Sequence, residues 1–193
     1  MDWEERFRAN DAPWERRELH PAFAHWTDLG LLKPGARIIV PGCGRAPEPL
    51  ELARAGLDVT LADLSDTALT WQEDAFRTAG LTMTRIDGDA LAFTPDQAFD
   101  LVWEQTFLCA ISPKLRPQYE DTVHRWLKPG GTLLALFMQK DEMGGPPYGC
   151  PLDAMHTLLP DTRWDWSAEP TQTAFPHPHL NDKAELAIPL VRR

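Results

Sequence analysis

Short apolar runs alternate along the chain with longer segments in which apolar residues recur at helical spacing. Five apolar runs predict strands, at Arg37–Val40, Asp58–Ala62, Thr82–Ile86, Phe99–Trp103 and Thr132–Met138. Helices are expected between them over 47–55 and 65–79, and on the face that carries Tyr119, Val123 and Trp126. This alternation is typical of a parallel sheet whose strands are connected by crossover helices.

Local turn signals place the ends of these elements. Ser65 is expected to cap the start of the second helix, and Gly80 follows its end. Gly56 is expected to close the first helix in the left-handed conformation. The Lys-Pro-Gly-Gly run at 128–131 predicts a turn before the fifth strand.

The pattern loosens after the fifth strand. Residues 141–151 are rich in glycine and proline and predict a loop, followed by a short helix near 153–159. The last candidate strands are Arg163–Ser167 and Glu185–Val191, and we expect them to form an antiparallel hairpin because no long helix separates them. The expected fold is α/β, with a Rossmann-like, mostly parallel seven-stranded sheet that carries this C-terminal hairpin and has helices on both faces. A single domain over 1–193 is expected from the length.

A glycine pair marks a candidate nucleotide site. Gly42 and Gly44 lie directly between a strand and a helix, where a doubly wound sheet binds nucleotides. Asp63 ends the next strand, at a spacing that suits a hydrogen bond to ribose hydroxyls. A tight turn and a helix cap would explain the same residues without a ligand, but their combination in one strand–loop–helix–strand unit favours a nucleotide-like cofactor.

The residue at position 47 bears on the choice of nucleotide. A dinucleotide fold favours a third glycine where the helix approaches the pyrophosphate, and this chain has Pro47. S-adenosylmethionine has no phosphate groups, so it does not require that glycine. Asp89, after the third strand, is a candidate acceptor for the adenine amino group, although a solvated loop carboxylate is an equal interpretation.

Charge and composition narrow the partners. The formal net charge is -10, and no run of Lys or Arg is longer than two residues, so nucleic acid is not an expected partner. No apolar run approaches the ~20 residues that span a bilayer, and the first residues do not resemble a secretory signal or a transit peptide. The expected state is a cytoplasmic protein, with a monomer favoured and a small molecule as substrate.

Cysteine and histidine spacing gives no metal prediction. Three separated cysteines, Cys43, Cys109 and Cys150, indicate neither a disulfide framework nor a zinc site. His177 and His179 flank a proline in a polar segment and are expected to be exposed rather than metal-bound. We therefore expect no metal.

Several segments of the chain resemble the thiopurine S-methyltransferase-like family, and most of all its thiol and halide methyltransferase branch. The similarity extends from Trp3 to about Leu159. In chain order, the segments that carry it are Val40-Pro41-Gly42-Cys43-Gly44-Arg45, Asp63-Leu64-Ser65, Gly88-Asp89, Thr106-Phe107-Leu108-Cys109-Ala110-Ile111, Arg116-x-x-Tyr119 and Gly144-Gly145-Pro146-Pro147-Tyr148.

The resemblance implies a class I methyltransferase with S-adenosylmethionine as its cofactor. It implies that Asp63 holds the ribose, that Asp89 and Ala90 flank the adenine, and that Glu104 and Gln105 approach the sulfonium. The full set of residues expected to contact the cofactor is Trp3, Phe7, Pro41, Gly42, Cys43, Gly44, Asp63, Leu64, Asp89, Ala90, Glu104, Gln105 and Thr106. Thiopurine-type members carry arginine where this chain has Gln105, which argues against thiopurines as its acceptors.

By the same resemblance, Trp3 and Phe7 match two aromatic residues that close over the cofactor. They are four residues apart and share a helical face. We therefore expect residues 1–30 to form a helical lid, and packing of an amphipathic helix on the core is compatible with that role.

The expected reaction is methyl transfer to a small, soft nucleophile such as a thiol, hydrosulfide, a halide or a thiopurine-like acceptor. The candidates for the acceptor pocket are Trp14, Phe107, Gln139 and Tyr148, each of which could equally pack in the core or a loop. Glu104 and Asp141 are the candidate catalytic proton acceptors, ahead of His20.

Three other functions remain open. One is a methyltransferase that acts on oxygen or nitrogen of a small molecule. The second is a nicotinamide oxidoreductase, against which Pro47 argues. The third is a non-catalytic module that binds the cofactor and acts through a partner.

Overall fold

A computed structural model describes residues 1–166, 173–178 and 183–193, and within it the chain divides into two compact units, Met1–Phe93 and Thr94–Arg193. Each unit combines strands with helices, as expected for an α/β protein. The single domain over 1–193 stays a prediction. Among the described residues, no helix is both long and apolar enough to cross a bilayer.

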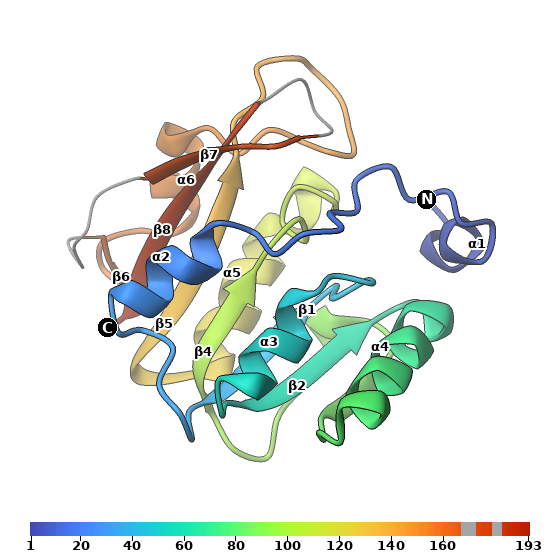
Figure 1. The fold of residues 1–193 in the computed structure, drawn as a ribbon. Helices are drawn as coiled ribbons and strands as arrows, with labels where there is room; N and C mark the ends of the chain where they lie inside the picture. The colour runs from blue at the N-terminus through green and yellow to red at the C-terminus, as the bar shows by residue number, and fades with distance from the viewer. Residues whose placement is uncertain (167–172, 179–182) are drawn as a thin grey trace. The chain divides into compact units, whose positions relative to one another are not determined.

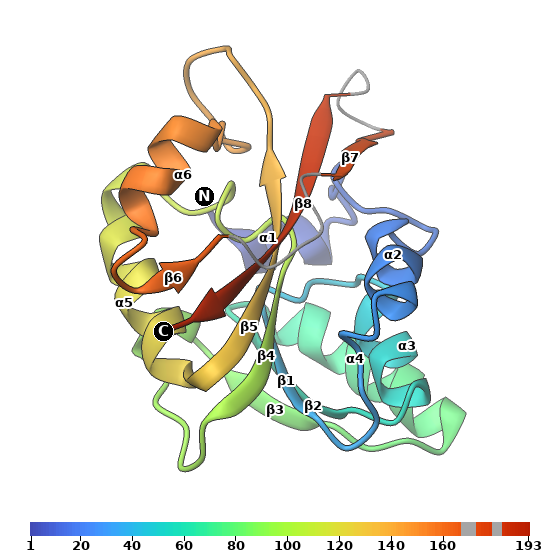
Figure 2. The ribbon, with the colours of Figure 1, turned by 90° about the vertical axis from the view of Figure 1, so that its left-hand side faces the viewer.

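The first unit contains three parallel strands in the order β3-β2-β1. Their bounds are β1 (Arg37–Pro41), β2 (Asp58–Asp63) and β3 (Thr84–Asp87), and the helices are α1 (Trp3–Arg8), α2 (Ala22–Asp28), α3 (Glu48–Arg54), α4 (Asp66–Ala79) and the 3-10 turn η1 (Ala90–Ala92). Figure 2 shows α3 and α4 on the same face of these strands. Because the three strands are parallel, their C-terminal ends lie at the same edge of the sheet, and the loop after each strand starts there.

The predicted caps of α3 and α4 are present. The Ser65 hydroxyl accepts a hydrogen bond from the backbone N–H of Ala68, and Gly80 ends α4 with φ +69°. Gly56, after α3, has φ +88°. Leu69 and Phe76 are buried on the apolar face of α4, which anchors that helix to the sheet.

The second unit contains a mixed sheet in the order β4-β5-β8-β6, with β7 paired to β8. Its elements are β4 (Phe99–Glu104), η2 (Pro113–Leu115), α5 (Arg116–Trp126), β5 (Leu127–Met138), α6 (Leu152–Leu158), β6 (Trp164–Asp165), β7 (Thr173–Pro176) and β8 (Ala184–Arg192). The β4–β5 pair is parallel, whereas β8 is antiparallel to β5, β6 and β7. Figures 1 and 2 show β8 alongside β5, with α5 and α6 together on one face of this sheet.

Two sequence expectations for this unit need correction. The residues that the structure describes form eight strands rather than the predicted seven, because Thr173–Pro176 forms β7. A four-residue run that ends in proline gives a weak strand signal, and proline is tolerated at a sheet edge. The run 128–131, predicted as a turn, belongs to β5, where the pairing with β4 shifts register between Phe99 and Leu101. Such a local irregularity accommodates glycine residues inside a strand.

The predicted strand Arg163–Ser167 is shorter than expected, since β6 covers only Trp164–Asp165 and Ser167 lies outside the described residues. His177 is buried rather than exposed, and its backbone N–H donates to the carbonyl of Lys183. His179 lies outside the described residues.

Candidate functional site

The glycine turn after β1 is held by the acid at the end of β2. The backbone N–H of Gly44 donates to Asp63 Oδ2 at 2.8 Å, and the backbone N–H of Ser65 donates to Asp63 Oδ1 at 2.9 Å. Gly42 and Gly44 have φ values of +58° and +48°, a conformation that favours glycine. The spacing that suggested a joint role for the turn and the acid therefore corresponds to a direct contact.

Asp63 is 7% exposed. Burial raises its pKa, and the hydrogen bonds from the backbone of Ser65 and Gly44 oppose that shift. A carboxylate offers about four acceptor positions, and the backbone N–H groups of Ser65, Gly44 and Leu64 use three of them. The ribose contact of Asp63 stays a prediction.

The loop after β3 lies at the same edge of the first unit. Asp63 is in register with Asp87, and the backbone N–H of Gly88 donates to the carbonyl of Asp63 at 2.9 Å. Asp89 is exposed and caps η1 through one side-chain oxygen, whereas Ala90 is buried. The other oxygen of Asp89 is available for the predicted adenine contact, which stays a prediction.

Three more predicted cofactor residues lie next to these loops. Pro41 is buried at the end of β1, and Cys43 is buried between the two glycine residues. Leu64 is 59% exposed beside Asp63. Their contacts with a cofactor remain predictions.

Gln72, which the sequence analysis did not identify, holds the glycine turn from α4. Its side-chain amide donates to the carbonyls of Gly44 and Ala46, at 3.0 and 2.9 Å. The available signal is its position between Leu69 and Phe76 on the apolar face of α4, where a buried amide needs a partner.

Residues 1–20, here called the N-terminal segment, lie against this glycine turn. The Phe7 ring is buried, and a Cβ added to Gly44 would be 3.2 Å from its Cζ atom. Trp14 lies between Trp3 and Phe7, with ring centroids 5.4 and 6.0 Å away in edge-to-face geometry. The predicted aromatic residues therefore form one cluster beside the turn.

Glu4, which the sequence analysis also did not identify, connects α1 to the start of α4. Its carboxylate accepts hydrogen bonds from the Ser65 hydroxyl at 2.6 Å and from the Thr67 hydroxyl at 2.8 Å. The backbone N–H of Thr67 and the Arg8 guanidinium also contact it. The hydrogen bonds from Ser65 and Thr67 lower the pKa of Glu4 to about 2, so the carboxylate is ionised at neutral pH.

In the second unit, Glu104 is 1% exposed and has three hydrogen-bond donors. Its Oε1 accepts from the backbone N–H groups of Phe107 and Leu108, and its Oε2 accepts from the Tyr119 hydroxyl at 2.8 Å. Burial raises its pKa to about 7, against the lowering effect of these bonds. Glu104 therefore fixes the turn that follows β4, where Thr106 has a φ of +60°.

Gln105 and the predicted pocket residue Phe107 lie on this turn, and the predicted pocket residue Tyr148 lies on the loop after β5. The Gln105 side chain accepts from the Trp103 indole N–H at 2.8 Å, and the backbone N–H of Tyr148 donates to the carbonyl of Cys109 at 2.7 Å. The Phe107 ring is 6.1 Å from the ring of Tyr119. The structure thus brings the loop 144–148 to the segment 106–111, a contact that the sequence analysis did not predict.

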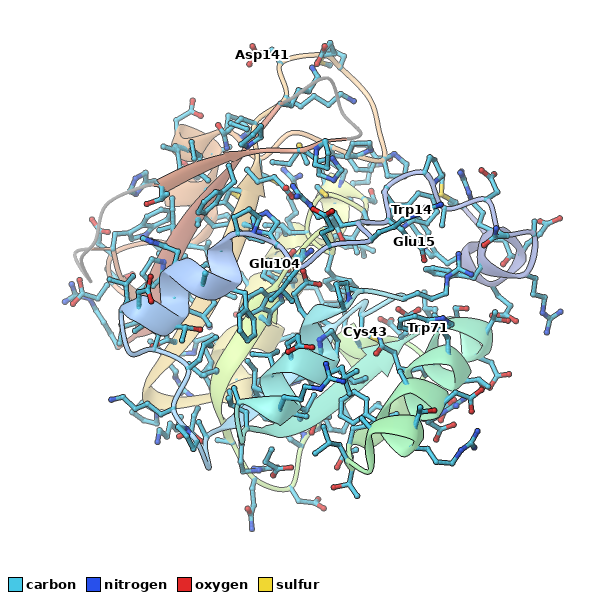
Figure 3. All side chains as sticks on the ribbon, in the orientation of Figure 1. Trp14, Glu15, Cys43, Trp71, Glu104 and Asp141 are labelled. Atoms are coloured by element: carbon cyan, nitrogen blue, oxygen red, sulfur yellow. The ribbon has the colours of Figure 1, made fainter. Side chains whose placement is uncertain are left out.

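Gln139 and Asp141 are placed differently. The Gln139 amide donates to the carbonyls of Phe137 and Cys150, which ties the two ends of the loop together. Asp141 is exposed, and Figure 3 shows it at the outer tip of the loop after β5, whereas Glu104 is buried in the interior. Asp141 and Glu104 are therefore not brought together.

Several named proteins are similar in sequence to this chain. The thiopurine S-methyltransferase family matches residues 1–185. "Probable thiol methyltransferase 2" of Arabidopsis thaliana is 34% identical over 149 residues, which cover 76% of this chain and 66% of that protein. "Thiocyanate methyltransferase 1" of the same organism is 29% identical over 160 residues, covering 81% of this chain and 70% of that protein. The match thus spans about two thirds of the length of these relatives.

A solved structure has the same fold. It is the 1,6-didemethyltoxoflavin-N1-methyltransferase of Burkholderia thailandensis with bound S-adenosylhomocysteine, which is 16% identical, with a TM-score of 0.72 over 100% of this chain and 85% of that one. These matches confirm the α/β methyltransferase fold, the family resemblance and S-adenosylmethionine as the cofactor. The chain therefore belongs to the thiopurine S-methyltransferase family, a family of S-adenosylmethionine-dependent methyltransferases.

Proposed function

We propose that the protein transfers a methyl group to a small, soft nucleophile, a thiol first of all and also hydrosulfide or a halide, that reaches the site already ionised. The family match and the names of its thiol and thiocyanate methyltransferase relatives support this class of acceptor. We also propose, from the sequence, that the protein is cytoplasmic and that residues 1–193 form a single domain.

The hydrogen bonding of Glu104 is the observation that carries the proposal. Both of its oxygens already accept hydrogen bonds, from two backbone N–H groups and one phenol. The other predicted proton acceptor, Asp141, is exposed at the end of a loop. Acceptors on oxygen or nitrogen normally need a positioned base, whereas a thiol with a pKa of about 8.5 is partly ionised in neutral solution.

Each unit has its own part in this proposal. When bound, S-adenosylmethionine supplies an activated methyl group on a positively charged sulfur. Asp63 and the glycine turn would hold its ribose and methionine portions, and Asp89 and Ala90 its adenine. Trp3 and Phe7 would cover it and exclude water, which strengthens the electrostatic interactions inside the site.

The acceptor side is assigned to residues of the second unit, and the role of Trp14, which belongs to the first unit, stays a prediction. Phe107 and Tyr148 would provide an aromatic surface for a polarisable sulfur, and Glu104 would fix the turn on which Gln105 and Thr106 lie. Gln139 would hold the loop that carries Tyr148. An in-line approach at roughly 3–3.5 Å from the methyl carbon is the geometry that methyl transfer needs.

Release of S-adenosylhomocysteine, measured with a panel of acceptors, tests the proposal. Thiols, hydrosulfide and iodide should give turnover, and the Asp63→Ala variant serves as a control for cofactor-dependent signal. If phenols or amines react and thiols do not, the assignment of a soft nucleophile is wrong.

A second candidate is a methyltransferase that acts on oxygen or nitrogen with Glu104 as general base. The observation in its favour is the pKa of Glu104, raised by burial to about 7, because a base works best near the operating pH. Good turnover of a phenol, abolished in Glu104→Gln, would support this alternative.

A further inference from the structure

Arg45 follows the glycine turn directly, and its guanidinium lies on the N-terminal segment. Its Nε donates to Glu15 Oε1 at 2.7 Å and its Nη2 to Glu15 Oε2 at 2.8 Å, which is a two-point contact with one carboxylate. Nη2 also donates to the side-chain oxygen of Asn10 at 3.0 Å. Figure 3 shows Glu15 beside Trp14, on the stretch that connects α1 to α2.

The same guanidinium contacts the aromatic cluster. It lies over the Phe7 ring, 5.5 Å from the ring centroid, and Phe7 in turn covers Gly44. Arg45 thus binds the N-terminal segment at Asn10 and Glu15 and supports the ring that closes on the turn. A planar guanidinium that meets a carboxylate at two points fixes orientation as well as distance.

This contact is partly withdrawn from water. The side chains of Arg45 and Glu15 are 17% and 24% exposed. Arg45 is also one peptide bond from Gly44, whose N–H is held by Asp63. Any group that orders the glycine turn therefore orders the backbone from which Arg45 reaches the N-terminal segment.

We propose that Arg45 and Glu15 are positioning residues that couple the binding of S-adenosylmethionine at the glycine turn to closure of the N-terminal segment. This inference rests on the proposed function, in which the cofactor binds at that turn. Neither residue acts on the methyl group. Their effect is on the affinity for the cofactor and on how long it stays bound.

The experiment measures binding of S-adenosylhomocysteine by calorimetry to the full chain and to the variants Glu15→Gln, Arg45→Gln and the double variant. Each single variant should bind about fivefold more weakly, as expected for a two-point ion pair at partial exposure. The double variant should be no weaker than the worse single variant, because the two residues act through one contact. Arg45→Lys keeps the charge but not the two-point geometry, and should lie between the wild type and Arg45→Gln.

Glu18→Gln is the matched control, since Glu18 is an exposed glutamate of the same segment and the charge change is identical. It should bind like the wild type. Trypsin cleavage within residues 1–20 gives a second measurement: ligand should protect the wild type and Glu18→Gln, and should protect Glu15→Gln less at equal saturation. A purely structural contact would lower the unfolding temperature without changing ligand-dependent protection.

The outcomes separate the two claims. If the wild type binds S-adenosylhomocysteine and Glu15→Gln binds and is protected equally well, the coupling is wrong and the proposed function stands. Additive losses in the double variant would also overturn the coupling. If the folded wild type does not bind S-adenosylhomocysteine, the proposed function itself fails.

Discussion

Gly44 donates its backbone N–H to the carboxylate of Asp63 at 2.8 Å, so the acid at the end of β2 holds the turn that follows β1. This contact connects two residues 19 positions apart in the sequence and restrains the glycine turn through one backbone N–H. The Asp63 carboxylate thus has a structural role and the proposed ribose-binding role at once.

Replacing Asp63 with alanine should weaken S-adenosylhomocysteine binding by roughly 10- to 150-fold, since a hydrogen bond to a charged group contributes about 1.5–3 kcal/mol. Calorimetry on the folded variant measures the effect. Asp58→Ala is the matched control, because Asp58 starts the same strand at the opposite end and is exposed. Equal affinity of Asp63→Ala and the wild type would remove Asp63 from the cofactor site.

A side chain at position 44 should disturb the packing of Phe7 of the N-terminal segment against the glycine turn. Gly44→Ala places a Cβ 3.2 Å from Phe7 at a φ of +48°, whereas Gly80→Ala has a similar φ of +69° with nothing within 4 Å. Both variants should lose about 1 kcal/mol of stability from the left-handed conformation. Only Gly44→Ala should increase trypsin cleavage within residues 1–20, and equal cleavage of both variants would contradict the contact with Phe7.

Glu4→Gln should loosen α1. The ionised carboxylate accepts hydrogen bonds from Ser65 and Thr67, and a neutral amide replaces them with weaker ones. The variant should be cleaved faster by trypsin within residues 1–20, with exposed Glu5→Gln as the control. Because the pKa of Glu4 is lowered to about 2, the wild-type contact should be fully present above pH 4.5 and be lost as the pH falls toward 2. With an acid-active protease, wild-type cleavage that increases between pH 4.5 and pH 2 supports this prediction, whereas a constant rate over that range, or an increase already at pH 6, contradicts it.

Glu104 should make stability depend on pH in the opposite sense. Its pKa is raised from 4.5 to about 7 by burial, so the folded protein keeps a proton that the unfolded chain releases. The stabilisation from the neutral form is complete below pH 4.5 and is lost as the pH rises through about 7, by roughly 3 kcal/mol in total. Urea unfolding at several pH values should show this loss in the wild type and in Glu5→Gln, but a flatter profile in Glu104→Gln. Identical profiles in all three proteins would refute the assignment.

The strand and helix pattern was predictable because each element carries its own local signal. The Ser65 cap and the turns at Gly56 and Gly80 follow from such signals and are confirmed. β7 was missed because four residues ending in proline do not form a recognisable period, and pairing with β8 defines that strand. The glycine residues at 130 and 131 indicated a turn, but they belong to β5, whose pairing with β4 shifts register between Phe99 and Leu101.

The candidate site was predictable where residues follow strand ends, as for Gly44 and Asp63. Contacts between distant segments were not predictable, since sequence spacing does not show which partner an acidic side chain will contact. Glu4 and Ser65 are 61 positions apart, and Glu15 and Arg45 are 30 apart. Glu104, the last residue of β4, was expected as a proton acceptor, and only the structure shows its three hydrogen-bond donors.

The central claim is that the acceptor ionises in solution and that no group of the enzyme takes its proton. The most direct measurement is the pH dependence of kcat/KM for a series of thiols of different acidity, at saturating S-adenosylmethionine. The account predicts that the inflection moves with the pKa of each thiol, and that Glu104→Gln, which preserves the hydrogen-bond acceptor for the 107–108 turn, leaves that inflection in place. An inflection near pH 7 that stays fixed across the thiols and disappears in Glu104→Gln would contradict the account, because it would identify Glu104 as the general base.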